Sequence, residues 1–277
     1  MHIDLNKTSP DWELIKFPDN SLKFKLKRKI RNKEIISISL HNNDDLILLG
    51  LTVHTLKQGG ATNISVLIKY MMYQQDDRLF NENESFGLKN ICSILNTYPV
   101  DMYYVYHPHS DKVEFLNNVR IIGSDQFFKS VLFGFKNDPP LWVIPDAGAF
   151  KTQVKQMSEI GYKGSFISCS KSRNPETGEL TQVIVCDDLE GKDVIIFDDI
   201  CLGGRTFIGI FNILKEKNCG KVYLAISHGL FNQGLEHLKV FDKIFTTDSI
   251  CQLQSNELLE VFPIQIGPTG KQITILI

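Results

Sequence analysis

The chain has 277 residues, of which 43% are hydrophobic and 22% are charged, so it can bury a sizeable core and belongs to the ordinary globular class. This composition excludes an intrinsically disordered chain, a collagen and a coiled coil. The formal charge of -2 excludes a broadly basic surface for nucleic acid, so any contact with phosphate groups is expected to be local.

The cysteines and the N-terminus indicate a cellular compartment. The six cysteines form no CxxC pair and have no zinc-ligand spacing, so we expect reduced, mostly buried thiols. The N-terminal residues include acids and no apolar leader, and no stretch is apolar for long enough to span a bilayer. We therefore expect a cytoplasmic protein without a membrane partner.

The first half of the sequence alternates between strand-like and helix-like segments. Residues 22–30 place Leu22, Phe24 and Leu26 on one face and lysines on the other, which is the period-two pattern of a half-buried strand. The next predicted elements are a helix at 46–56, a strand at 64–68, a helix at 87–95 and a strand at 102–106.

The second half begins after Pro139 and Pro140, which cannot continue a helix or a central strand. We place a linker at 136–140 and two domains at 1–138 and 139–277. The elements predicted beyond it are strands at 141–144, 164–169, 183–186, 194–197 and 222–227, helices at 151–160 and 206–217, a polar loop at 170–179, and two short strands within 262–277. This alternation predicts an α/β fold with mainly parallel sheets flanked by helices.

One motif, VIIFDDICLGGRT, joins a buried strand to a helix and carries chemistry. Ligands of open parallel sheets bind beyond the carboxyl ends of the strands, where Asp198 and Asp199 lie. These acids can accept hydrogen bonds from sugar hydroxyls or hold Mg²⁺ through its waters. Gly203 and Gly204 let backbone N–H groups approach a phosphate at a helix N-terminus. The alternative is a plain strand-to-helix connection capped by Thr206.

The motif resembles the ribose-phosphate site of type I phosphoribosyltransferases and of ribose-phosphate pyrophosphokinases. Residues 70–78 (YMMYQQDDR) are similar to the ATP-binding segment of the pyrophosphokinases. Residues 106–111 (YHPHSD) place His109 where that family keeps the histidine serving the metal–ATP complex. Residues 143–148 (VIPDAG) resemble a Ser-Pro-Asp-x-Gly turn, with Asp146 as its acid. Simple phosphoribosyltransferases lack the first two elements.

The resemblance also covers a flap and extends in register over most of the chain, from about residue 17 to residue 248. Lys171 and Arg173 stand where the pyrophosphokinases carry the Lys-x-Arg that reaches the transferring phosphates. The resemblance implies two phosphoribosyltransferase-like domains, a homo-oligomer such as a dimer or hexamer, and two Mg²⁺ ions bound with ATP.

The family's chemistry implies diphosphate transfer from ATP to the anomeric hydroxyl of a 5-phosphorylated ribose, with release of AMP. The implied catalytic residues are Lys171, Arg173 and His109. The implied ATP-binding residues are Phe17, Asp19, Gln75, Asp76, Asp77, Arg78 and His109. The implied ribose- and phosphate-binding residues are Asp146, Asp198, Asp199, Gly203, Gly204, Arg205 and Thr206, and the implied metal ligands are His109, Asp146, Asp198 and Asp199.

Several residues depart from the family's pattern. The sugar-phosphate loop normally reads Asp-Thr-Gly/Ala-Gly-Thr, but here it reads LGGRT. Arg205 brings a permanently charged planar group that suits a diphosphate ester, so ADP-ribose is a candidate acceptor beside ribose 5-phosphate. The alternative is drift with the backbone donors retained. Gln75 and Asp76 stand where Arg-Gln is usual, which removes a cation from the nucleotide segment.

Two further functions stay open at this point. A phosphoribosyltransferase that consumes the 1-diphosphate sugar explains Asp198 and Asp199 but leaves residues 70–78 and His109 without a role. An inactive regulatory homologue that assembles with an active partner explains the altered residues but not the retained cations Lys171 and Arg173.

Overall fold

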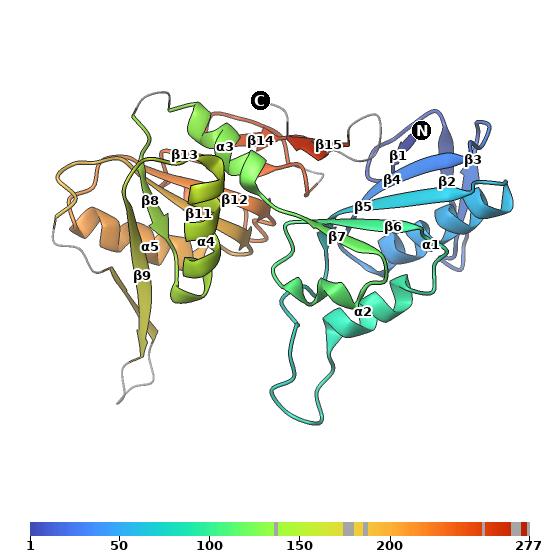
Figure 1. Cartoon of the computed structure of the whole chain (residues 1–277), viewed down its shortest axis with the longest axis horizontal. Coiled ribbons are helices and arrows are strands. Elements are labelled where there is room, and N and C mark those ends of the chain that lie inside the picture. Colours follow the sequence, from blue (N-terminus) through green and yellow to red (C-terminus); the bar gives the residue numbers. More distant parts are fainter. Residues whose placement is uncertain (136–137, 174–179, 185–187, 251–252, 267–272, 276–277) are drawn as a thin grey trace. The chain divides into compact units, whose positions relative to one another are not determined.

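The structure is a computed structural model that describes residues 1–135, 138–173, 180–184, 188–250, 253–266 and 273–275. It divides into two compact units, formed mainly by Met1–Gly123 and by Ser124–Asp248, with Ser249 and Ile250 added to the first. Each unit is built around one sheet flanked by helices (Figure 1).

The first unit contains a five-stranded sheet in the order β1-β4-β5-β6-β7, in which all neighbours are parallel. Its strands are β1 (His2–Asp4), β4 (Lys33–Leu40), β5 (Asn63–Met71), β6 (Met102–Tyr106) and β7 (Val119–Ile122). A separate antiparallel ribbon is formed by β2 (Trp12–Lys16) and β3 (Leu22–Leu26). The helices are α1 (Asn43–Gln58), α2 (Gly87–Leu95) and the short 3₁₀ helix η1 (Asp111–Phe115).

Local sequence signals explain the start of α1. The Asn42 side chain accepts a hydrogen bond from the Asp45 N–H, and the Asp45 carboxylate accepts one from the Asn42 N–H, which forms a capping box. The apolar residues of α1 then pack against the central strands and against Phe24 of the ribbon. Burial of this apolar surface is the main force that holds the helix to the sheet.

A residue from late in the chain completes the first unit. The Ser39 hydroxyl at the end of β4 donates a hydrogen bond to the backbone oxygen of Ser249 at 2.5 Å, across 210 positions of sequence. Both residues are fully buried. The first unit is therefore not continuous in sequence.

The second unit contains a seven-stranded sheet in the order β10-β9-β8-β11-β12-β13-β14, in which only the β10–β9 pair is antiparallel among the described strands. Its strands are β8 (Leu141–Ile144), β9 (Phe166–Arg173), β10 (Leu180–Ile184), β11 (Val194–Cys201), β12 (Val222–Gly229), β13 (Lys243–Thr247) and β14 (Leu259–Phe262). The other elements are α3 (Asp125–Phe133), α4 (Ala147–Ile160), α5 (Arg205–Glu216), the 3₁₀ helix η2 (Glu236–Leu238), and the paired strands β15 (Ile264–Ile266) and β16 (Ile273–Ile275).

Helices cover both faces of this sheet. Successive residues of a strand point to opposite sides and therefore contact different helices. Trp142 of β8 packs on Phe128 of α3 and donates its indole N–H to Gln153 of α4 at 2.7 Å. Its neighbour Val143 lies in the cluster that contains Ile210 of α5. The central strands are therefore buried on both faces, as expected for a parallel sheet.

The α/β fold class predicted from the sequence is confirmed, and most of the predicted elements are present. The division between the units, however, falls after Gly123, because α3 packs on the second sheet through Phe127 and Phe128. This division differs from the boundary that the sequence predicts at 138–139, and residues 136–137 of the predicted linker lie outside the described residues. The loop predicted at 170–179 is partly wrong, since β9 continues to Arg173 and pairs with β10.

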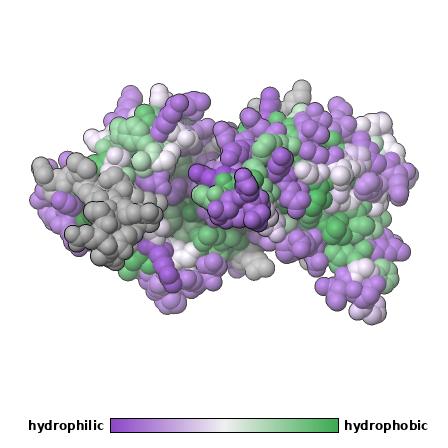
Figure 2. Space-filling model, turned by 90° about the horizontal axis from the view of Figure 1, so that it is seen from below, coloured by the Kyte–Doolittle hydropathy of each residue, from purple (hydrophilic) through white to green (hydrophobic). Residues whose placement is uncertain are grey.

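The surface of the described residues is mixed in character. Figure 2 shows hydrophilic residues interspersed with smaller hydrophobic areas on the face that it presents. Within the described ranges, none of the helices combines the length and the apolar character that crossing a bilayer requires.

Candidate active site

The site in the second unit begins with two acids at the end of the central strand β11. Residues 194–197 of this strand are fully buried, whereas Asp198 and Asp199 are half-buried. The Asp199 N–H donates to Asp198 Oδ1 at 2.9 Å. Burial, together with the charge of Asp199, raises the pKa of Asp198 well above the ordinary aspartate value. Such a carboxyl group carries negative charge at a cost unless a cation or a hydroxyl donor approaches it.

A third acid lies within electrostatic reach of this pair. Asp146 follows β8 and is the N-cap of α4, where its Oδ1 accepts a hydrogen bond from the Ala149 N–H at 3.0 Å. The charge of Asp146 is a further cause of the raised pKa of Asp198. The structure therefore brings together these three predicted residues.

The chemistry of these carboxylates fits Mg²⁺ bound through its waters, because the ion prefers oxygen ligands and retains several waters. The fit is limited to this outer type of binding. In the described ranges, no group of three or more His, Cys, Asp and Glu side chains is arranged to ligate a metal directly.

The glycine loop leads from these acids into α5. Gly204 is the N-cap of α5 with φ at +75°, and the helix begins at Arg205. The first turn closes with the bond from the Ile208 N–H to the Gly204 oxygen at 3.0 Å, so the N–H groups of residues 205–207 precede it. Thr206 is exposed inside the first turn, and the structure therefore contradicts the alternative in which it caps the helix.

The start of α5 has the electrostatic character of an anion site. The helix N-terminus carries partial positive charge, and the exposed Arg205 adds a full one beside it. Together with the acids that precede it, this end of the sheet can hold a group with sugar hydroxyls at one side and a phosphate at the other.

Residues 230–237, which no motif in the sequence singles out, hold this loop in place. The Cys201 oxygen accepts bonds from the N–H groups of Leu230 and Phe231, at 2.9 and 3.2 Å, and the Leu202 oxygen accepts one from Asn232 at 3.0 Å. The Gly203 oxygen accepts a bond from His237 Nε2 at 2.7 Å. No spacing rule in the sequence joins residues 201–203 to residues 230–237, because only the fold brings them together.

Replacing Gly204 with alanine is expected to destabilise the protein more than the same change at Gly234. Both glycines have positive φ, near +75°, which costs an alanine about 1–2 kcal/mol. At Gly204 the added methyl group would also lie 2.6 Å from Leu238 Cδ2, whereas nothing lies within 4 Å of the corresponding position at Gly234. Urea unfolding of both variants measures the difference, and equal losses would contradict tight packing at Gly204.

The first unit places the predicted nucleotide residues on the loops after β5 and β6. The Gln74 side chain is buried, and its Oε1 accepts a bond from the His109 N–H at 3.0 Å. This contact brings His109 beside residues 74–78. Gln74 belongs to the segment that suggested a nucleotide site, yet its own contact with His109 was not predicted.

Two acids of this segment already have partners. Asp76 Oδ2 accepts a bond from the Gly87 N–H at 2.8 Å, at the start of α2. Burial alone would raise the pKa of Asp77, but hydrogen bonds from Arg78 and Ser110 outweigh it and hold the pKa below the ordinary value. Asp76 thus contacts the start of α2, which could not be predicted from its standing in place of a family glutamine. Gln75 and Arg78 are exposed.

The remaining predicted residues lie on the ribbon and on the flap. Asp19 accepts bonds from the N–H and hydroxyl of Ser21, at 3.0 and 2.7 Å, and these bonds lower its pKa. Phe17 in the same turn is 43% exposed. Lys171 and Arg173 lie in β9, opposite Gln182 and Leu180 of β10, and residues 174–179 between these strands lie outside the described residues.

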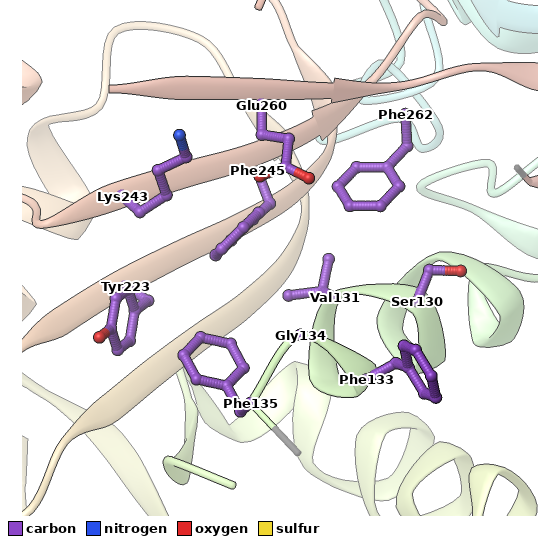
Figure 3. A pocket seen from close by; sticks show the side chains of 10 residues that line it. All are labelled: Ser130, Val131, Phe133, Gly134, Phe135, Tyr223, Lys243, Phe245, Glu260 and Phe262. Carbon is purple, nitrogen blue, oxygen red and sulfur yellow. The ribbon is translucent and has the colours of Figure 1, made fainter. Parts of the chain in front are cut away.

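A cavity of about 280 Å³ opens elsewhere in the second unit, between the end of α3 and strands β12 to β14 (Figure 3). It is lined mainly by the aromatic side chains of Phe133, Phe135, Tyr223, Phe245 and Phe262. The rings of Phe135 and Tyr223 lie 4.8 Å apart. None of the residues that line the cavity is among the catalytic, binding or metal-ligating residues predicted from the sequence.

Known proteins resemble this chain over most of its length. Residues 2–98 match the family of the N-terminal domain of ribose phosphate pyrophosphokinase. The chain is 29% identical to the ribose-phosphate pyrophosphokinase of Pyrococcus furiosus, over 86% of this chain and 85% of the relative. It is 25% identical to the enzyme of the same name from Mycoplasmopsis pulmonis, over 84% and 75%.

A solved structure shows the same fold. The phosphoribosylpyrophosphate synthetase of Mycobacterium smegmatis superposes with a TM-score of 0.76 at 19% identity, covering 91% of this chain and 85% of that chain. The chain is thus 25–29% identical to named ribose-phosphate pyrophosphokinases over 84–86% of its length, and it shares the fold of the synthetase over 91%.

Proposed function

We propose that this chain, which is similar to the ribose-phosphate pyrophosphokinases over most of its length, transfers the β,γ-diphosphate of ATP to the anomeric hydroxyl of a 5-phosphorylated ribose. The products are a 1-diphosphate sugar and AMP. The observation that carries the proposal is the site at the end of β11, where Asp198 and Asp199 lead directly into the glycine loop and the N-terminus of α5.

In this reaction the second unit holds the acceptor. Asp198 and Asp199 accept hydrogen bonds from the ribose hydroxyls, and Asp146 adds negative charge beside them. The N–H groups at the start of α5 and the Arg205 guanidinium bind the 5-phosphate. No covalent intermediate with the protein is needed, so its task is to position the reactants and to neutralise charge.

The first unit and the flap supply the donor side. Residues 75–78 and His109 bind ATP, and Phe17 and Asp19 belong to the same nucleotide function. Lys171 and Arg173 stabilise the negative charge of the transferring diphosphate. Bound Mg²⁺, two ions by family resemblance, would neutralise oxygens of ATP, with His109, Asp146, Asp198 and Asp199 as the residues that serve it.

The acceptor is either ribose 5-phosphate or ADP-ribose. The names of the relatives support ribose 5-phosphate. The exposed Arg205 and the apolar Leu202, which is 40% exposed, support an acceptor that carries a diphosphate ester. A homo-oligomer stays a prediction of the family resemblance, and a cytoplasmic location stays a prediction from the cysteines and the N-terminal residues.

A product assay tests the proposal. Purified protein, Mg²⁺ and ATP are incubated with ribose 5-phosphate or with ADP-ribose, and AMP release and the mass of the sugar product are followed. We expect one added diphosphate on one of the two acceptors. Absence of AMP from both reactions would overturn the proposal and favour a regulatory homologue. Consumption of a 1-diphosphate sugar without ATP would favour a phosphoribosyltransferase.

A further inference from the structure

The carbonyl groups of the sugar-phosphate loop are held from one side by residues 230–237. The donors to Cys201 and Leu202 are backbone N–H groups, which every residue except proline supplies. The donor to Gly203 is different, because it is a side chain, that of His237. This bond therefore depends on the identity of one residue.

We propose that His237 is a positioning residue that fixes the loop of residues 202–204 in its phosphate-binding conformation. This inference rests on the proposed function of the loop. A carbonyl oxygen can only accept a hydrogen bond, so the proton lies on His237 Nε2, which is 2.7 Å from the Gly203 oxygen. Both the neutral Nε2–H form and the charged imidazolium can make this bond.

The loop needs such a restraint because two of its residues are glycines. Glycine has the widest choice of backbone conformations, so Gly203 and Gly204 lose the most freedom when the loop is ordered. A bond to the carbonyl between them restricts the peptide plane that joins the two residues. The phosphate then meets donors that are already in place and does not have to order them on binding.

Packing around Gly204 shows that η2 lies directly against the loop. A Cβ atom at Gly204 would lie 2.6 Å from Leu238 Cδ2 and 3.3 Å from His237 Nε2. Leu238 is fully buried, so η2 is anchored in the core of the second unit. The imidazole therefore projects onto the loop from a fixed element, which is the arrangement that a positioning residue requires.

The test compares variants that differ in the hydrogen-bond donor. His237→Phe keeps a planar ring without a donor, and His237→Gln keeps an N–H donor on a flexible chain. We expect His237→Phe to raise the KM for the phosphorylated acceptor about tenfold, equal to about 1.4 kcal/mol, with little change in the KM for ATP. His237→Gln should recover most of the loss. Lys239→Gln, on the same turn but exposed, is the control.

A second readout does not depend on turnover. Calorimetric titration with ribose 5-phosphate and with inorganic phosphate, without ATP, should show the same order of affinities among the variants. Equal affinity of His237→Phe and the unchanged protein would overturn the inference, and so would equal losses in His237→Phe and His237→Gln. His237→Leu provides a second donor-free variant if His237→Phe does not fold.

The two failures are distinguishable. Phosphate binding that depends on the His237 donor, without formation of AMP from either acceptor, would leave the inference standing and overturn the proposed function. Formation of AMP at rates and KM values that do not change in the His237 variants would support the proposed function and overturn the inference. Failure of the unchanged protein to bind either phosphate probe would overturn both.

Discussion

Asp198→Asn is expected to lower kcat by about 10²–10³-fold while raising the melting temperature at pH 7. The loss of activity is expected because the neutral amide of asparagine cannot hold a cation or a sugar hydroxyl with a full negative charge. Removal of one group that stabilises charge typically lowers kcat by this factor. The gain in stability follows from the raised pKa of Asp198, which is caused by burial and by the charge of Asp199. Melting curves and initial rates on the same preparation measure both effects.

The direction of the pH dependence follows from proton binding. Because the pKa of Asp198 is higher in the folded protein, the folded state binds this proton more tightly than the unfolded chain does. Its favourable contribution is complete below the ordinary aspartate pKa and is lost as pH rises through the folded pKa. Asparagine removes this loss, so the difference in melting temperature should shrink as pH falls toward the ordinary aspartate range.

A matched control separates this effect from loss of net charge. Glu190→Gln removes one negative charge from an exposed side chain just before β11, where Glu190 pairs only loosely with Lys192 at 3.6 Å. It should leave the rate and the melting temperature nearly unchanged. A lower melting temperature of Asp198→Asn at pH 7 would contradict the conclusion that the charged Asp198 side chain destabilises the folded protein.

Glu34→Gln is expected to lower the free energy of unfolding by about 3–5 kcal/mol, because it breaks a buried ion pair. It leaves Arg28 with the looser contact to the Asp11 carboxylate, at 3.7 Å. The Glu34 carboxylate is fully buried and accepts two parallel bonds from Arg28, at 2.8 and 2.7 Å, and one from the Arg31 N–H at 2.8 Å. A neutral amide cannot accept both guanidinium bonds. Urea unfolding at constant pH measures the change.

The control for this prediction is another ion pair of the first unit. Glu13 contacts Lys27 at 3.0 Å, with both side chains nearly half exposed. Solvent screens such a pair, so Glu13→Gln should leave the free energy of unfolding almost unchanged. If the two substitutions changed the free energy of unfolding equally, burial would not explain how much Glu34 stabilises the protein.

The parts of the fold that could be predicted are those whose signal is local. The strand before Asp198 and the helix after Gly204 could be predicted because the apolar run, the two acids and the two glycines follow one another closely in the sequence. Strand β4 and helix α3 were missed, and α3 is held mainly by rings from distant strands, such as Phe197 and Phe262. Polar residues 170–173 suggested a loop, yet backbone pairing with β10 makes them a strand.

The same division applies to the site. The acids after β8 and β11 could be predicted, because strand ends in parallel sheets are the usual place for ligands. The partners that hold the loops could not be predicted. His237 lies 34 positions from Gly203, and Gly87 lies 11 from Asp76. Such pairs are set by the path of the chain between them, and no periodicity in the sequence encodes that path.

The bond between Ser39 and Ser249 has a consequence for the order of events on the ribosome. Ser249 is synthesised 210 positions after Ser39, which at about 5–20 residues per second is roughly 10–40 s later. The first sheet can form during that interval, but the Ser39 hydroxyl at the end of β4 lacks the Ser249 oxygen until residues 124–248, most of the second unit, have been made. The nascent first unit is thus completed only when almost the whole chain has emerged.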